Sequence, residues 1–485
     1  MKDLKERTLR GGLVAICAQA VKFVLRTGSL VVLARLLTPK DFGLVGMVTA
    51  VTGVLGIFKD GGLSVVTIQR AAITDEQIST LFWLNTLLGV VLFGLSLAIA
   101  PVLVAFYHES RLFWVTAVLA SGFVFSGTAA QQQALLQRQM RFAGLAVVEV
   151  LSLSVSIAVA IVMAANGYGY WALVGMYVML PAINTILMWL VAAWIPGMPR
   201  RKVGARSMLH FGGNVSLNSL IAYFANNTDK ILLGRFCGAE ALGIYGRGYQ
   251  LISIPTENLN AAIGSVAFPA LSRIQDDPER FKNYFIKGYS LVLALTLPVT
   301  IACALFANEI IFVVLGTKWM AVAAIFRLLA PTVLAVALMN PFTWVLVSMG
   351  LVGKTLKMGL VIAPVTIAGY AVGLTYGPSG VAFGYSAVMM LLIVPVIAWA
   401  KHGTLISSRD ILQAVSRPFL SAAVAAAVAI GVQLLCGRSL SPVLRLTVGV
   451  GVMLSSYLWM LLYVMGQKAI YLDLFRSLRR RSSAD

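Results

Sequence analysis

Long apolar runs separated by short polar segments fill almost the whole chain. Windows of about 19 residues predict fourteen helices long enough to cross a bilayer. The expected spans are residues 12–37, 42–65, 80–105, 112–130, 144–166, 171–195, 211–236, 242–266, 284–307, 322–348, 357–376, 379–400, 417–436 and 442–465. The pattern therefore predicts an all-α polytopic membrane protein.

Composition supports the membrane setting and narrows the chemistry. The chain is 59% hydrophobic and 12% charged, whereas soluble domains are about 25% charged. Its net charge of +20 does not indicate a nucleic-acid partner, because most cations lie between the apolar runs. The four cysteines have no metal-ligand spacing. We expect no metal, no cofactor and no catalytic residue.

The distribution of cations predicts the orientation. With the N-terminus inside, 24 Lys and Arg fall in inside segments, counting Lys357 and Arg417 at the inner ends of their spans, and 4 fall in outside connections. The outside cations are Lys40, Arg111, Lys318 and Arg438. Cytoplasmic loops are enriched in Lys and Arg, so we expect both termini in the cytoplasm. The basic start runs into a span longer than a signal-peptide core, so the first span is expected to stay in the protein.

A polar stripe crosses the first span. Gln19, Lys22, Arg26 and Ser29 follow 3, 4, 3 spacing, which places them on one helix face. Lys22 lies ten residues past Gly12, roughly 15 Å along a helix, and so near the middle of a bilayer. A Lys or Arg there costs about 2.5 to 3.5 kcal/mol if it faces lipid. The stripe therefore predicts a polar cavity inside the protein.

An internal repeat organises the chain at an offset of 200 residues. Identical pairs are Leu9 and Leu209, Gly12 and Gly212, Leu33 and Leu233, Arg35 and Arg235, Gly43 and Gly243, and Gly46 and Gly246. We expect a six-helix lobe over residues 1–200, a second over 201–405, and two trailing helices with a basic tail over 406–485. Six spans per copy predict pseudo-symmetry about the membrane normal, with a substrate path between the lobes.

Four acids fall within the expected spans: Asp60, Glu149, Asp229 and Glu257. Carboxylates inside a membrane protein bind a coupling ion or pair with cations of neighbouring helices. The sequence favours internal pairing and leaves ion coupling open.

One small-residue motif bears on helix packing. Gly380 and Gly384 form a GxxxG pattern, which lets two helix backbones approach closely. The sequence favours a contact within the bundle over a dimer face.

Six segments together resemble the Wzx-type polysaccharide flippases, close to the colanic acid exporter, of the multidrug/oligosaccharidyl-lipid/polysaccharide exporter superfamily. They are residues 33–44 (LARLLTPKDFGL), 60–70 (DGGLSVVTIQR), 81–85 (LFWLN), 135–142 (LLQRQMRF), 268–277 (FPALSRIQDD) and 316–319 (GTKW). The resemblance implies two six-helix lobes plus two helices around a cavity open alternately to each side. It also implies an inner-membrane protein that moves undecaprenyl-pyrophosphate-linked oligosaccharide to the outer leaflet.

The resemblance also suggests site residues and partners. Related lipid II flippases line a cationic cavity with arginines of the first helix, a role that Lys22 and Arg26 fit by binding the pyrophosphate. Candidate hydrogen-bond partners for the sugar or headgroup are Gln19, Ser29, Asn214, Asn218 and Asn226. The expected partners are the lipid-linked substrate, membrane lipid and other polysaccharide assembly proteins.

Two other functions remain open. An ion-coupled drug antiporter of the same superfamily would share the fold. A membrane polysaccharide polymerase is the least favoured, because such enzymes need a sizeable outer loop and the longest outer connection expected here, about 308–321, is short.

Overall fold

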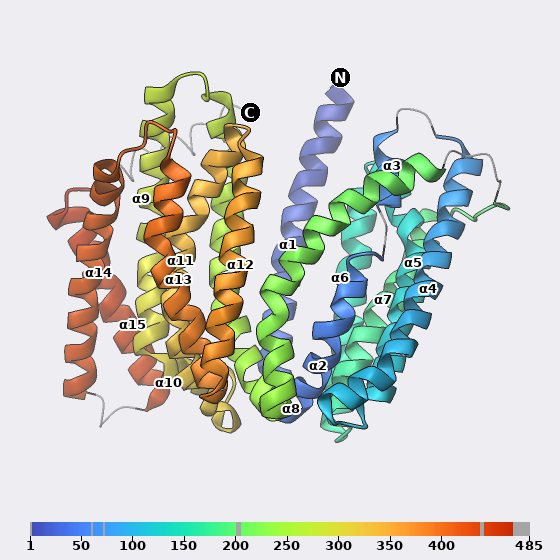
Figure 1. The fold of residues 1–485 in the computed structure, drawn as a ribbon, viewed down its shortest axis with the longest axis horizontal. Helices are drawn as coiled ribbons and strands as arrows, with labels where there is room; N and C mark the ends of the chain where they lie inside the picture. Colours follow the sequence, from blue (N-terminus) through green and yellow to red (C-terminus); the bar gives the residue numbers. More distant parts are fainter. Residues whose placement is uncertain (1, 60–61, 71–72, 200–204, 437–440, 469–485) are drawn as a thin grey trace. The chain divides into compact units, whose positions relative to one another are not determined.

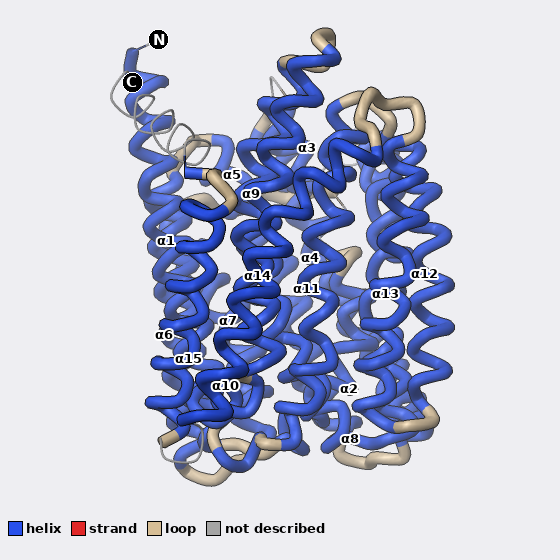
Figure 2. Tube along the Cα trace, turned by 90° about the vertical axis from the view of Figure 1, so that its left-hand side faces the viewer, coloured by secondary structure: helices blue, strands red, loops and turns tan. Residues whose placement is uncertain are grey.

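A computed structural model describes residues 2–59, 62–70, 73–199, 205–436 and 441–468. Within these ranges the chain consists of helices and loops without a strand, as Figure 2 shows. Eleven helices of the described ranges are long and apolar enough to cross a membrane. The predicted all-α polytopic membrane class is confirmed.

The helices have the following bounds. They are α1 (Lys2–Leu36), α2 (Pro39–Gly56), α3 (Leu63–Gln69), α4 (Asp75–Tyr107), α5 (Leu112–Arg138), α6 (Phe142–Ala165), α7 (Tyr170–Ala192), α8 (Ala205–Arg273), α9 (Pro278–Leu305), α10 (Ala307–Val314), the short 3₁₀ helix η1 (Thr317–Trp319), α11 (Ala321–Ser348), α12 (Val352–Leu374), α13 (Gly377–Lys401), α14 (Ser408–Cys436), α15 (Pro442–Trp459) and the π-helical turn η2 (Met460–Val464).

The chain forms two compact units, residues 1–243 and 244–485. In the first unit α1 packs along α6, α6 along α7, and α5 lies between α4 and α7 (Figure 1). In the second unit α11 packs against α9 and α13, and α13 pairs with α12. There α14 packs against α9 and α15. Each unit is thus a bundle of neighbouring antiparallel helices joined by short loops.

Two segments differ from the expected spans. The span expected at 42–65 is two helices, because α2 ends at Gly56 and α3 begins after Gly62. Gly62, directly before α3, has φ 73°, a left-handed backbone conformation that glycine adopts without strain. The connection expected at 308–321 is also structured, since it contains α10 and η1. A hydropathy window measures the apolar content of a segment. A helix break inside the segment does not change that content, so the window does not detect it.

The repeat positions Gly43 and Gly243 meet in the first unit. A Cβ at Gly43 would overlap the carbonyl oxygen of Ala239, and a Cβ at Gly243 would overlap that of Pro39. Both contacts join α2 to α8, and residues 39 and 43 are offset by 200 from residues 239 and 243. Reciprocal contacts of this kind are typical of elements related by a two-fold axis.

Helix breaks also fall at equivalent positions of the repeat. Gly238 interrupts α8 with φ 84° and ψ −179°, a conformation that only glycine adopts readily. Its counterpart Thr38 separates α1 from α2 and forms a capping box with Asp41. The Asp41 carboxylate accepts from the Thr38 backbone N–H at 2.9 Å. The first copy therefore breaks its helix with a capped turn and the second with a glycine.

The GxxxG motif packs within the second unit, as predicted. A Cβ at Gly380 would overlap the carbonyl oxygen of Gly373, and one at Gly384 would overlap that of Gly369. Gly369 and Gly373 lie on α12, whereas Gly380 and Gly384 lie on α13. The two backbones therefore touch along a pair of glycine stripes.

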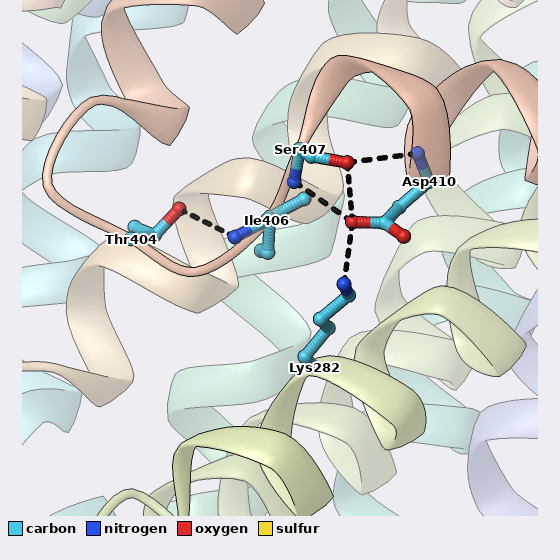
Figure 3. A network of polar contacts seen from close by, with 5 residues as sticks. All are labelled: Lys282, Thr404, Ile406, Ser407 and Asp410. Atoms are coloured by element: carbon cyan, nitrogen blue, oxygen red, sulfur yellow. Dashed lines mark hydrogen bonds and ion pairs between the residues drawn. The ribbon is translucent and has the colours of Figure 1, made fainter.

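A polar network ties α9 to the start of α14 (Figure 3). Asp410 Oδ2 accepts from the Ser407 backbone N–H at 2.9 Å and from the Lys282 ammonium at 2.8 Å. The Ser407 hydroxyl also donates to this oxygen, while the Asp410 N–H donates to Ser407 Oγ. Thr404 Oγ1 accepts from the Ile406 N–H in the preceding loop. This capped helix start holds two helices of the second unit together.

Candidate functional site: a cationic cavity in the first unit

A cavity of about 720 Å³ lies among the helices of the first unit. Five helices contribute to it: α1, α3, α5, α6 and α7. Its lining residues are Lys22, Arg26, Lys59, Ser64, Val65, Ile68, Ser126, Ala129, Ala130, Gln133, Ala134, Gln137, Glu149, Leu153, Leu180, Pro181 and Asn184. Its size is that of a small-molecule site, and its wall is unusually polar for membrane-spanning helices.

Helix α1 supplies two cations to the cavity. Lys22 and Arg26 are four residues apart, so they lie one above the other on the same helix face. That face turns toward α6, against which α1 packs. Lys22 is partly buried and Arg26 is exposed to the cavity. The predicted polar cavity beside the Lys22 and Arg26 stripe is present in the structure.

Glu149 of α6 faces Lys22 across the cavity wall. Its Oε2 lies 2.5 Å from the Lys22 ammonium nitrogen. The two side chains are 36% and 20% exposed, so water partly screens the pair. Position 149 places the carboxylate on the α6 face that packs on α1. Of the two interpretations offered for Glu149, internal pairing is the arrangement observed.

Uncharged polar residues complete the wall on α5 and α7. Ser126, Gln133 and Gln137 of α5 are separated by seven and four residues, which aligns them on one helix face. Asn184 extends this polar surface from α7. Amide side chains donate and accept hydrogen bonds without a net charge, so they suit hydroxyl-rich ligands. The sequence contained this spacing, but we did not predict these residues.

The charges of the cavity favour an anion. Lys22, Arg26 and Lys59 line it together with Glu149, which leaves an excess of two positive charges. Lys59 lies in the turn that follows α2. Charges interact more strongly in a partly water-excluded site than in bulk water. A phosphate or pyrophosphate would be stabilised here, and a cationic ligand would be repelled.

The short helix α3 forms one side of the cavity and is held by α5. The Arg138 guanidinium donates to the carbonyl oxygens of Thr67 and Arg70, each at 2.7 Å. The Thr67 hydroxyl donates to Gln131 Oε1 at 2.8 Å. Arg138 thereby satisfies carbonyls at the end of α3 that have no partner within the helix. Thr67 and Arg70 belong to one of the segments that resemble the flippase family, and Arg138 belongs to another. Their contacts stabilise one side of the cavity.

The other predicted site residues lie elsewhere. Gln19 and Ser29 share α1 with the two cations but do not line this cavity. Asn226 is exposed on α8, and Glu257 is exposed on the same helix in the second unit. Asp229 is fully buried, and its Oδ1 accepts from the Lys230 backbone N–H at 2.8 Å.

For three predicted site residues the structure describes no side chain. Asp60 lies outside the described residues, as do the side chains of Asn214 and Asn218. The structure therefore joins Lys22, Arg26 and Glu149 in one cavity and leaves the roles of the other candidates as predictions.

Comparison with known proteins finds relatives that are named for polysaccharide biosynthesis. Residues 32–324, more than half of the chain, match the family described as "Polysaccharide biosynthesis protein". The teichuronic acid biosynthesis protein TuaB of Bacillus subtilis (strain 168) is 31% identical over 296 residues, 61% of either chain. The match thus spans about three fifths of that relative. The lipopolysaccharide biosynthesis protein WzxC of Escherichia coli (strain K12) is 25% identical over 400 residues, 80% of either chain.

The fold has a known counterpart among solved structures. The lipid II flippase MurJ, in an inward closed conformation, superposes with a TM-score of 0.75 and 13% identity. The superposition covers 96% of this chain and 99% of MurJ. At this identity the likeness concerns the fold. The relatives and the eleven apolar helices together establish a multi-pass membrane protein.

Proposed function

Because the chain belongs to the polysaccharide biosynthesis protein family, we propose that it is a flippase for lipid-linked oligosaccharides. Its substrate would be an undecaprenyl-pyrophosphate-linked repeat unit, moved from the inner to the outer leaflet of a bacterial inner membrane by alternating access. The observation that carries this proposal is the cationic cavity inside a bundle of membrane-spanning helices. The Wzx and MurJ relatives support the same class of transport.

The cavity suits the chemistry of such a substrate. A pyrophosphate must cross an apolar barrier, and fixed cations stabilise it there more than they would in water. Lys22, Arg26 and Lys59 would bind the pyrophosphate, while Gln133 and Asn184 would hydrogen-bond the adjacent sugar. Further candidate sugar contacts are Gln19, Ser29, Asn214, Asn218 and Asn226. Candidate ion-coupling residues are Asp60, Glu149, Asp229 and Glu257.

The proposal includes a repeat-based architecture. Of about fourteen helices, six would form lobe 1–200 and six would form lobe 201–405. The last two helices and a cytoplasmic tail would follow over 406–485, with both termini inside. The reciprocal contacts of Gly43 and Gly243 support the repeat, as do the helix breaks at Thr38 and Gly238. Membrane lipid and other polysaccharide assembly proteins would be the partners.

Depleting the protein in its native host should reduce exposure of the lipid-linked sugar on the outer leaflet. The reason is that the pyrophosphate headgroup does not cross the apolar core unaided at a useful rate. The measurement is outer-leaflet labelling of the sugar, with total lipid-linked sugar as the control. Normal labelling together with normal surface polymer would contradict the proposal. A change in drug susceptibility alone would favour the antiporter alternative.

A further inference from the structure

The Lys22 and Glu149 pair is part of the cavity wall rather than of the helix packing behind it. Both side chains line the cavity, and their charged atoms lie 2.5 Å apart. They come from α1 and α6, two helices packed along each other. Glu149 is the one carboxylate among the lining residues of this described cavity. The pair therefore lies in the space that a bound anion would approach.

Among the described residues that line the cavity, the charged groups other than Glu149 are cationic. Arg26 faces the cavity from α1, and Lys59 faces it from the segment after α2. Helix α7, also packed on α6, has no charged residue between Tyr170 and Ala192, all of which the structure describes. On α5 the cation is Arg138, which binds the carbonyls of Thr67 and Arg70. Lys22 is thus the cation that Glu149 engages in the cavity.

We infer that Glu149 is a built-in competitor that the anionic headgroup must displace from Lys22. This inference rests on the proposed function and adds a means of release to it. A phosphate bound to Lys22 would bring two like charges together if Glu149 stayed in place, so binding requires the ion pair to open. When the pair closes again, Lys22 is withdrawn from the phosphate. Competition within the wall thereby prevents the cations from holding the substrate too tightly.

The geometry makes opposite predictions for binding and transport in Glu149→Gln. Glutamine leaves Lys22 without a carboxylate competitor, so the headgroup should bind about tenfold more tightly. This is the factor expected from one charge-assisted interaction of ordinary strength. Release should become slower, so the transport rate should fall. If Glu149 only packed α6 against α1, Glu149→Gln would not combine tighter headgroup binding with slower transport.

The test measures binding of farnesyl pyrophosphate to the full-length protein in detergent, with farnesol as the uncharged control ligand. Glu279→Gln, an exposed acid at the start of α9, is the matched control variant and should bind like wild type. Glu149→Gln should tighten binding about tenfold in the wild-type background. In a Lys22→Gln background the same change should tighten it about threefold or less, because the contested cation is gone.

Two results would overturn the inference. One is equal or weaker binding by Glu149→Gln, with thermal stability unchanged. The other is a gain in affinity from Glu149→Gln that is as large in the Lys22→Gln background as in the wild-type background. That result would indicate general repulsion of the ligand by the carboxylate, without competition for Lys22. These outcomes differ from failure of the proposed function, in which the expected binding pattern appears but depleted cells still expose the sugar normally.

Discussion

The Lys22→Ala, Arg26→Ala double variant is expected to lose transport while it still inserts and folds. Both side chains line the cavity, and their removal abolishes its excess of positive charge because only Lys59 and Glu149 remain, which cancel. Each charge-assisted contact to a phosphate contributes about 1.5 to 3 kcal/mol, so losing two should lower transport roughly a hundredfold or more. The measurement is restoration of surface polysaccharide in depleted cells.

The control for this variant removes two cations outside the cavity. Arg280→Ala with Lys287→Ala changes exposed residues of α9 and should restore polymer like wild type. Protein amount in the membrane and thermal stability must be compared for both variants. Full restoration by a well-expressed Lys22→Ala, Arg26→Ala protein would reject the role of the cavity cations.

The Gly43→Ala variant is expected to lose much of its stability. The new methyl group would overlap the Ala239 carbonyl oxygen, and a backbone atom yields far less than a flexible side chain. Overpacking at such a contact destabilises by about 3 kcal/mol or more. The measurement is the thermal unfolding temperature of the purified protein and its yield.

Gly56→Ala is the matched control on the same helix. A Cβ at Gly56 meets no atom within 4 Å, so this change should be neutral or stabilise by up to about 1 kcal/mol. Gly243→Ala should resemble Gly43→Ala, because it makes the reciprocal contact with Pro39. A Gly43→Ala protein as stable as wild type would show that α2 and α8 do not approach as described.

Periodicity in the sequence was enough to predict an all-helical membrane protein and to single out two residues that line the cavity. Lys22 and Arg26 stood out because a charge deep in an apolar run is energetically costly, whatever packs around it. The pattern of Gly380 and Gly384 likewise predicted a close contact without naming its partner. Such features depend on the residue and its own helix, so a single sequence reveals them.

Contacts between distant helices could not be predicted in this way. Glu149 was recognised as an intramembrane acid, but its partner Lys22 is 127 residues away and no local spacing links them. Gln133 and Gln137 showed the right spacing, yet uncharged amides carry a weaker signal than charges. Lys59 was not among the predicted site residues, because hydropathy does not show that α2 ends at Gly56. These assignments required the packing of the bundle.

Transport by the purified protein tests the central claim most directly. Lipid-linked oligosaccharide from the native host, tagged on its sugar, would be placed in vesicles with wild-type protein, with the Lys22→Ala, Arg26→Ala variant, or without protein. The access of a membrane-impermeant reagent to the tag reports movement between leaflets. We expect rapid exchange with wild type and only the protein-free rate with the variant. Equal rates in all three kinds of vesicle would contradict the assignment of this protein as a flippase.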